Sequence, residues 1–123
     1  YHKNLTNFIK DKLKKFSKVS LVAVHSFTKR HKNFDRGIEV GLLWNKNMNL
    51  LLPIQEGLKK QKIHFGRNYP YPGFYYNYTL DKLSKKKLNN ICIEIRNDLI
   101  CSEKGIKKYV EIFSNIFKGF LND

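Results

Sequence analysis

One short segment places ionisable side chains on an otherwise apolar strand. Residues 90–96, Asn-Ile-Cys-Ile-Glu-Ile-Arg, are rich in β-branched residues and predict a central strand. Because side chains alternate between the two faces of a strand, the isoleucines share one face, and Cys92, Glu94 and Arg96 share the other. A buried carboxylate or guanidinium is costly unless it is paired or takes part in chemistry. Glu94 and Arg96 are therefore candidate site residues; the alternative is an edge strand whose polar face meets water.

A histidine closes a second apolar segment. Residues 19–25, Val-Ser-Leu-Val-Ala-Val-His, predict a buried strand that ends at His25. In open α/β sheets ligands bind beyond the carboxyl ends of strands, where a histidine could bind a metal ion or act as a base. Taken alone, such a histidine is more often a hydrogen-bonded core residue. His31 and His64 stand in polar surroundings, and we expect both at the surface.

Five motifs follow one another along the chain. They are His25-Ser26-Phe27-Thr28, Arg36 with Gly41-Leu42-Leu43-Trp44-Asn45, Asn68 with Pro70, Tyr71 and Gly73, Tyr78-Thr79-Leu80, and Glu94-Ile95-Arg96-Asn97-Asp98-Leu99-Ile100. In this order they resemble the motifs of the N-formylglutamate amidohydrolase family. Tyr1-His2 is also similar to the Tyr-His that opens the helix before the family's His-Ser-Phe strand. The resemblance covers nearly the whole chain, and five ordered segments are far more specific than one.

The resemblance implies a fold, a metal and a reaction. The fold is the three-layer α/β/α, phosphorylase/hydrolase-like fold of the zinc carboxypeptidases, of which this chain would form the C-terminal part. One divalent metal, Zn²⁺, is the expected cofactor, with His25 as a ligand and Glu94 as the carboxylate that activates the attacking water. The expected substrate-binding residues are Arg96, Arg36, Asn45, Asn68 and Tyr71. The implied reaction is hydrolysis of the amide bond of an N-formyl or N-acyl amino acid such as N-formylglutamate, which belongs to histidine catabolism.

The chain also departs from the family's pattern. The family's first metal motif has no counterpart here, so we expect an upstream segment of the same protein to supply the other ligands, a His and a carboxylate. Lys29 replaces a Pro, Pro72 a Ser, Tyr69 an acidic residue and Leu83 a His. These changes favour, as an alternative, a non-catalytic relative of the family.

The surrounding pattern predicts the elements that would position these residues. Apolar spacing predicts helices at 3–16, 48–61 and 103–121, strands at 38–44 and 62–66, loops at 26–37 and 66–79, and a short helix or turn at 80–88. Asn47 could cap the middle helix, in which Pro53 should produce a kink or delay the start. The order predicts one α/β domain over residues 1–123, with a mostly parallel or mixed sheet.

Composition limits the remaining functional classes. The net charge of +14 could indicate a nucleic-acid-binding module, but 20 of the 24 basic residues are Lys, whereas base and bidentate phosphate recognition favours Arg. No apolar run is long enough to span a membrane, and no secretory signal opens the chain. Two cysteines make no disulfide framework, so we expect a cytoplasmic protein with reduced thiols and a small-molecule substrate.

Overall fold

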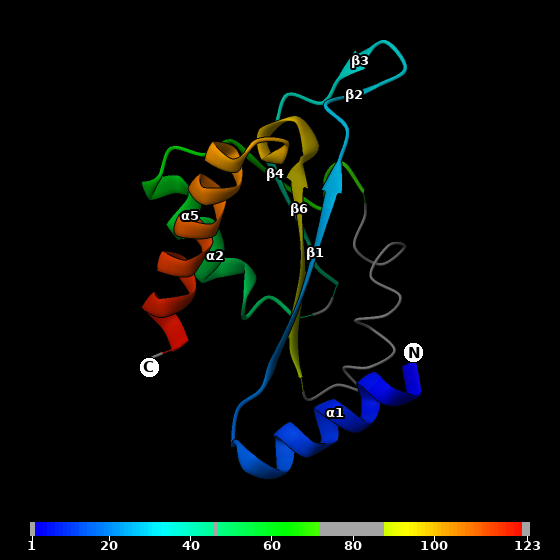
Figure 1. The fold of residues 1–123 in the computed structure, drawn as a ribbon, viewed down its shortest axis with the longest axis vertical. Helices are drawn as coiled ribbons and strands as arrows, with labels where there is room; N and C mark the ends of the chain where they lie inside the picture. The colour runs from blue at the N-terminus through cyan, green and yellow to red at the C-terminus, as the bar shows by residue number, and fades with distance from the viewer. Residues whose placement is uncertain (1, 46, 72–87, 122–123) are drawn as a thin grey trace.

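The chain forms a four-stranded mixed sheet with two helices on one face (Figure 1). The computed structural model describes residues 2–45, 47–71 and 88–121. The elements are α1 (His2–Lys15), β1 (Ser20–Phe27), β2 (Arg30–His31), β3 (Phe34–Asp35), β4 (Val40–Leu43), α2 (Leu51–Lys60), β5 (Phe65–Arg67), β6 (Asn89–Arg96), the 3₁₀ helix η1 (Asn97–Ile100) and α5 (Glu103–Leu121). The predicted α/β class with a mixed sheet is confirmed.

Strand β6 lies inside the sheet, whose order is β1-β6-β4-β5. β1 runs parallel to β6, β4 runs antiparallel to it, and β5 runs parallel to β4. Residues 90–95 of β6 are all buried, which confirms the prediction of a central strand. The register places His25 of β1 and Gly41 of β4 on either side of Glu94.

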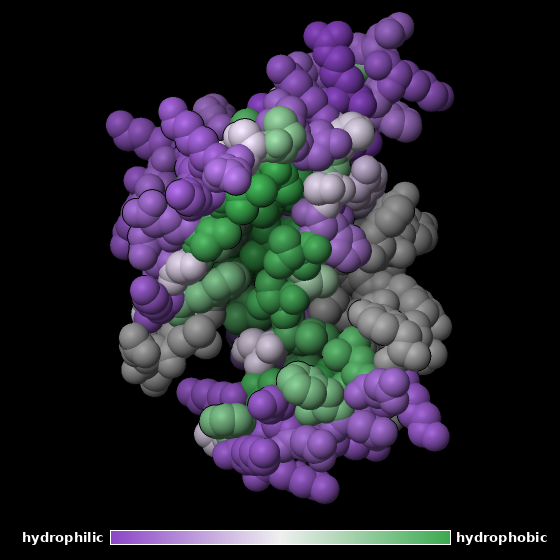
Figure 2. Space-filling view, viewed as in Figure 1, coloured by the Kyte–Doolittle hydropathy of each residue, from purple (hydrophilic) through white to green (hydrophobic). Residues whose placement is uncertain are grey.

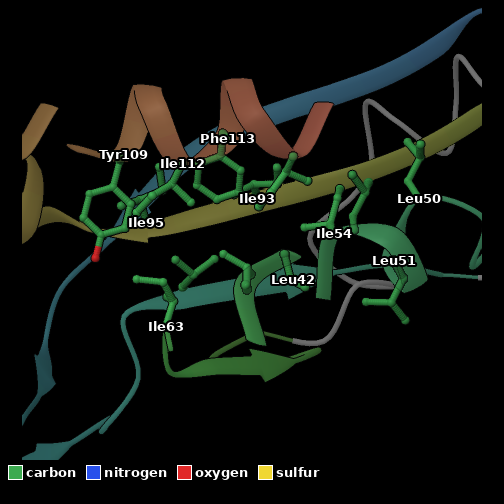
Figure 3. Close-up of a cluster of buried hydrophobic side chains, with 14 residues drawn as sticks. Leu42, Leu50, Leu51, Ile54, Ile63, Ile93, Ile95, Tyr109, Ile112 and Phe113 are labelled. Carbon is green, nitrogen blue, oxygen red and sulfur yellow. The ribbon is translucent and has the colours of Figure 1, made fainter. Parts of the chain in front are cut away.

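The isoleucine face of β6 forms the core together with α2 and α5 (Figure 3). Ile91, Ile93 and Ile95 pack with apolar side chains of β4 and both helices. These partners include Val40, Leu42, Leu51, Ile54, Leu58, Tyr109, Ile112, Phe113 and Ile116. Burying one such side chain contributes roughly 1.5–3 kcal/mol, so this layer supplies most of the stabilising burial. The opposite face of β6 is thereby left for Cys92 and Glu94.

Helix α1 confirms the predicted N-terminal helix but buries little of its apolar face. Ile9 is buried, whereas Phe8 and Leu13 of the helix and Phe16 just after it are about half exposed. In Figure 1, α1 lies across one end of the sheet and not along the helical layer. Within the described ranges, no helix combines the length and apolar character needed to cross a membrane.

Two predictions about β1 and the residues after it are wrong. β1 is an edge strand of the described sheet, so most of its side chains are half-buried or exposed instead of buried. The strand also runs past His25 to Phe27, which is buried. The predicted loop at 26–37 contains a short hairpin of β2 and β3, closed by a turn in which Lys32 has a φ of 56°. His31 and His64 are exposed, as predicted.

Helix α2 begins at Leu51, later than the predicted residue 48. Pro53 lies in its first turn, where backbone N–H groups have no helical acceptor, so the late start of the helix accommodates the proline. The prediction that Asn47 caps this helix is wrong, because Leu50 occupies the N-cap position without a side-chain bond. Asn47 Oδ1 instead accepts from the Asn49 N–H at 2.9 Å in the turn before the helix, and its Nδ2 donates to Asn89 Oδ1 at 3.0 Å, which ties this turn to the start of β6.

Several sequence expectations fall outside the described residues. They concern Tyr1, Pro72, Gly73, the Tyr78-Thr79-Leu80 motif, Leu83 and most of the segment 80–88. Of the predicted loop at 66–79, residues 66 and 67 belong to β5, and the described part ends at Tyr71.

Helices α2 and α5 cross where Gly57 faces Ile116, and this contact gives a test of the helical layer. A Cβ at Gly57 would lie 2.5 Å from Ile116 Cγ1 and 2.9 Å from its Cδ1, so in Gly57→Ala the Ile116 side chain or the helices must shift. We expect it to destabilise the chain by roughly 1–2 kcal/mol, because overpacking outweighs the gain in helix propensity. Chemical denaturation measures this free energy.

Gly119 is the matched control for this substitution. It also lies in a helix, but nothing lies within 4 Å of a Cβ built there. Gly119→Ala should therefore stabilise the chain by roughly 0.5–1 kcal/mol through propensity alone. Equal effects of the two substitutions would contradict the close crossing of α2 and α5.

Candidate active site

The carboxylate of Glu94 and the imidazole of His25 meet on the face of the sheet opposite the helices. His25 and Glu94 are register partners in the parallel pair of β1 and β6, so their side chains point to the same side. His25 Nδ1 lies 3.6 Å from Glu94 Oε1. The Glu94 side chain is 6% exposed and that of His25 is 59% exposed, so a buried acid stands behind an accessible imidazole. The structure thus brings together the two residues at the centre of the predicted site.

Cys92 joins this pair as its third member. It lies two residues before Glu94 on the same face of β6, and its Sγ lies 3.9 Å from Glu94 Oε1, to which the thiol donates a hydrogen bond. Alternation along the strand predicted Cys92 on this face, but its sequence context indicated only a reduced thiol. The signal that could have identified its role is the two-residue spacing from an acid on a buried strand.

Burial dominates the electrostatics of Glu94. Removal from water raises the pKa of its carboxyl group above the ordinary value of 4.5, and the smaller opposing effects of His25, the Cys92 thiol and Arg36 do not cancel this rise. Glu94 Oε2 is buried and has no hydrogen-bond partner among the described residues. This oxygen therefore keeps an unused acceptor capacity inside the protein, which is costly for a charged carboxylate.

The Cys92 thiol is held in its protonated form. Burial, the charge of Glu94 and the hydrogen bond to that carboxylate, in this order, raise the pKa of Cys92 to about 12. A neutral thiol is a weak nucleophile, because the thiolate is the reactive form. The geometry therefore favours a donor role for Cys92 over nucleophilic catalysis.

Arg36 and Tyr71 form a cationic edge beside the acid. The Arg36 Nη1 group donates to Tyr71 Oη at 3.2 Å and to the Thr28 carbonyl oxygen at 3.1 Å. Its guanidinium carbon also lies 5.1 Å from the centre of the Tyr71 ring and 5.9 Å from that of Phe27. Since Arg36 lowers the pKa of Glu94, its charge reaches the site. These contacts hold a half-buried guanidinium in one place, although 35 residues separate Arg36 from Tyr71.

Gly41 allows the chain after β5 to approach Glu94 closely. A Cβ at Gly41 would collide with the carbonyl oxygen of Tyr69 and lie 3.4 Å from Glu94 Cβ. Asn68 supports this approach from a left-handed φ of 52°, because its N–H donates to the Leu42 carbonyl and its Oδ1 accepts from the Trp44 N–H. Asn68 thus fixes the backbone beside the site.

The two remaining predicted substrate residues are Arg96 and Asn45. The Arg96 guanidinium is mostly buried and donates to Asp98 Oδ1 at 2.7 Å and to the Ile38 carbonyl at 3.3 Å. These bonds join the end of β6 to η1 and to the residues before β4. Asn45 is half-buried just after β4 and Trp44. The closest grouping is therefore His25, Cys92 and Glu94, with Arg36 and Tyr71 beside it.

The donor atoms of the His25, Cys92 and Glu94 group fit a metal ion. One atom from each residue can be chosen so that all three lie within 4.8 Å of one another. Ligands of a tetrahedral zinc, with bonds of ~2.0–2.3 Å, stand roughly 3.3–3.8 Å apart, close to the 3.6 and 3.9 Å separations here. A sulfur ligand must lose its proton, which the pKa of about 12 opposes in Cys92. Cys92 is thus the weakest ligand candidate of the three.

Known proteins resemble both the sequence and the fold. The sequence pattern of the N-formylglutamate amidohydrolase family matches residues 1–101, which confirms the resemblance seen in the motifs. Among solved structures, that of the gene product Atu2144 from Agrobacterium tumefaciens matches with a TM-score of 0.79 and 27% sequence identity. The match covers 97% of this chain and 50% of that chain, so this chain spans about half the length of its relative. No curated protein sequence matches the chain.

Because the pKa of Glu94 is raised, the charged carboxylate should destabilise the fold, and this effect should depend on pH. A carboxyl group with a raised folded-state pKa stabilises the fold below its unfolded pKa, and this stability is lost as the pH rises through the folded pKa. At pH 7 and without metal, Glu94→Gln should therefore unfold at a higher temperature, with a gain of roughly 1 kcal/mol. The gain in stability should shrink toward pH 4, where the protonated Glu94 and the glutamine that replaces it are both neutral. Thermal unfolding in a chelator from pH 4 to pH 8 measures it.

Glu111→Gln is the control for this effect. Glu111 is an exposed carboxylate on α5, so its substitution should change the unfolding temperature little at any of these pH values. If the gain in unfolding temperature of Glu94→Gln instead grew as the pH fell, the direction of the pKa shift of Glu94 would be wrong.

Proposed function

The chain belongs to the N-formylglutamate amidohydrolase family, and on this premise we propose that it contributes His25 and Glu94 to a zinc-dependent site that hydrolyses N-formyl or N-acyl amino acids such as N-formylglutamate. The observation that carries the proposal is a buried carboxylate, with Oε2 unbonded among the described residues, 3.6 Å from an accessible imidazole. The remaining metal ligands would come from polypeptide outside this chain. The proposal therefore concerns the complete site, of which this chain supplies one half.

His25 serves as the metal ligand of this half-site. Its ring is accessible on the open side of β1, whereas Glu94 approaches it from the buried side. A zinc ion held there would act as a Lewis acid toward the amide carbonyl and would acidify water. Cys92 contributes a neutral thiol that donates to Glu94 Oε1, the oxygen that also faces His25.

Glu94 acts as the proton carrier. Its carboxylate accepts a proton from the attacking water, whose oxygen adds to the amide carbon. When the carbon–nitrogen bond breaks, Glu94 delivers this proton to the leaving nitrogen. The products are a carboxylic acid and a free amine. Burial raises the pKa of Glu94 and so makes it a stronger base than an exposed carboxylate.

Arg36 is the residue best placed to bind a substrate carboxylate. Its guanidinium is half-buried, held by Tyr71 and the Thr28 carbonyl, and close enough to Glu94 for its charge to be felt there. Arg is the natural partner of a carboxylate, because its fork of N–H groups matches both oxygens. This supports an amino-acid substrate such as N-formylglutamate.

The other predicted substrate residues take supporting roles in this proposal. Asn68 holds the backbone at Trp44, and Arg96 joins β6 to η1 through Asp98. Tyr71 orients Arg36, and Asn45 lies just after Trp44 at the end of β4.

Zinc analysis and N-formylglutamate hydrolysis test the proposal on the polypeptide that carries this chain together with the rest of the family domain. Glu94→Gln should lower kcat by roughly 10²–10⁴-fold while the substrate still binds, since the proton carrier is lost. His25→Ala should remove most of the bound zinc, because one ligand is deleted. Formate release and metal content measure the two effects.

Glu111→Gln again serves as the control, with both readouts unchanged. A Glu94→Gln enzyme within tenfold of the unsubstituted rate would rule out Glu94 as the proton carrier. Loss of zinc in that variant would instead assign Glu94 to the metal.

Arg36→Lys tests the substrate class. Lysine keeps the charge but loses the planar fork, so KM for N-formylglutamate should rise by roughly tenfold or more while kcat changes less. Arg30→Lys, at an exposed position on β2, should leave KM unchanged. Steady-state kinetics decide between these outcomes. An unchanged KM in Arg36→Lys would place the substrate carboxylate elsewhere.

A further inference from the structure

The β2–β3 hairpin directly follows the strand that carries His25. Residues 28 and 29 join the end of β1 to β2. The hairpin projects beyond the sheet in Figure 1, and Figure 2 shows this end of the molecule as largely hydrophilic surface. Arg36, which follows β3, returns toward the site through its bonds to Tyr71 and to the Thr28 carbonyl oxygen. The hairpin is thus anchored beside the site by the residue proposed to bind a substrate carboxylate.

The register of the hairpin places Lys29 opposite Arg36. The pairing of Arg30 with Asp35 sets the register of β2 and β3. The Arg36 N–H donates to the Lys29 carbonyl oxygen at 3.0 Å, which continues this ladder by one pair. Opposite residues of an antiparallel pair project their side chains from the same face. The side chains of Lys29 and Arg36 therefore start out side by side.

The two faces of the hairpin differ in their balance of charge. On one face Arg30 stands opposite Asp35, and such a pairing of opposite charges stabilises a ladder. On the other face two cations stand opposite each other, which is destabilising unless an anion lies between them. Among the described residues, no carboxylate forms an ion pair with Lys29 or Arg36. The unbalanced face is the one that carries Arg36 to the site.

Lys29 is an accessible cation near the end of β6. Its side chain is exposed, whereas that of Arg36 is half-buried. The pKa of Asp98 is lowered chiefly by the hydrogen bond from Arg96, and the charge of Lys29 adds a smaller lowering. The charge of Lys29 is thus felt just beyond the strand that carries Glu94. Because the family's motif has a Pro at this position, the cation is a feature of this chain.

We propose that Lys29 is a specificity-determining residue of the site, which binds the side-chain carboxylate of an acidic N-acyl amino acid while Arg36 binds its α-carboxylate. Opposite Cβ atoms of a ladder lie roughly 4.5–5.5 Å apart. The two carboxylate carbons of a glutamate skeleton are joined through four carbon–carbon bonds, which span about 5 Å when extended. The two cations therefore match the two charges of one substrate molecule. The inference rests on the proposed function and adds the residue that distinguishes an acidic from a neutral side chain.

The two cations differ in what they can select. Arg36 is held by Tyr71 and the Thr28 carbonyl, and its planar fork suits a carboxylate in a fixed position. The α-carboxylate has such a position, because its distance from the scissile amide is the same in every N-acyl amino acid. Lys29 carries a compact charge on a flexible stem, which suits a side-chain carboxylate whose reach depends on the amino acid. Loss of Lys29 should therefore change selectivity and not the reaction itself.

A pair of substrates tests the proposal on the polypeptide that carries this chain together with the rest of the family domain. N-formylglutamine has nearly the size of N-formylglutamate but a neutral side chain. Lys29→Asn should lower kcat/KM for N-formylglutamate by roughly threefold to tenfold, because one accessible charge pair is lost. It should leave kcat/KM for N-formylglutamine nearly unchanged. Steady-state kinetics on both substrates measure the ratio.

Lys32→Asn is the matched control, because it removes the same charge from the turn of the same hairpin. Lys32 has a left-handed φ of 56°, which asparagine tolerates, so the turn is kept. The preference for N-formylglutamate should remain that of the unsubstituted enzyme in this variant. An equal loss of preference in Lys29→Asn and Lys32→Asn would assign the effect to the overall charge of the hairpin and overturn the proposal.

Binding of glutarate separates this inference from the proposed reaction. Glutarate carries two carboxylates and no scissile amide, and its monoamide carries one carboxylate. Calorimetry should show that Lys29→Asn weakens the binding of glutarate by roughly threefold to tenfold and leaves that of the monoamide unchanged. This result, in a polypeptide that does not hydrolyse N-formylglutamate, would support the role of Lys29 while contradicting the proposed function. Hydrolysis with an unchanged preference in Lys29→Asn, or no preference for glutarate over its monoamide, would overturn the inference alone.

Discussion

Glu94 carries an ionisable group inside a sheet, where the water that would stabilise its charge is excluded. The surroundings of this carboxylate reduce that cost without removing it. Cys92 donates one weak hydrogen bond, His25 lies 3.6 Å away, and Arg36 adds a more distant positive charge. One oxygen still has no partner among the described residues. Such an arrangement is poor for stability but well suited to a group that must exchange a proton.

The buried carboxylate of Glu94 also constrains β1 and β4, the two strands that flank β6. On one side, β1 must place an imidazole in register with the acid. On the other, β4 must carry Gly41, because the Tyr69 carbonyl occupies the space that a Cβ would need. The core on the opposite face of the sheet then holds β6 in place through its isoleucines. Packing and chemistry are therefore divided between the two faces of a single strand.

The sequence was sufficient for the parts of the structure that depend on local pattern. Alternation along residues 90–96 identified the central strand and the face of Glu94, and three-and-four spacing located α5. It failed for β1, because an apolar run does not reveal whether a second strand covers its outer edge. Asn47 carries a common capping side chain, but the helix begins only at Leu51, so this side chain bonds the Asn49 N–H in the preceding turn and the distant Asn89.

The candidate site was predictable to a similar extent. The order of the motifs identified His25, Glu94, Arg36 and Tyr71 as site residues. Nothing in the local sequence indicated that Arg36 would donate to Tyr71 or that Arg96 would donate to Asp98. These contacts depend on how distant segments pack. Cys92 was missed because a cysteine on a buried strand is commonly inert.

The alternation of buried and site-facing side chains along β6 also limits the insertions and deletions that the strand can accept. Its side chains serve the core and the site by turns, so inserting or deleting one codon within the strand would exchange the two faces beyond that point. An isoleucine would then face His25, and the carboxylate would enter the layer of Leu42 and Phe113. The turn of the β2–β3 hairpin, in contrast, lies in an exposed segment where a change of length displaces no buried side chain. Length variation among related sequences should therefore gather at the hairpin and avoid the central strand.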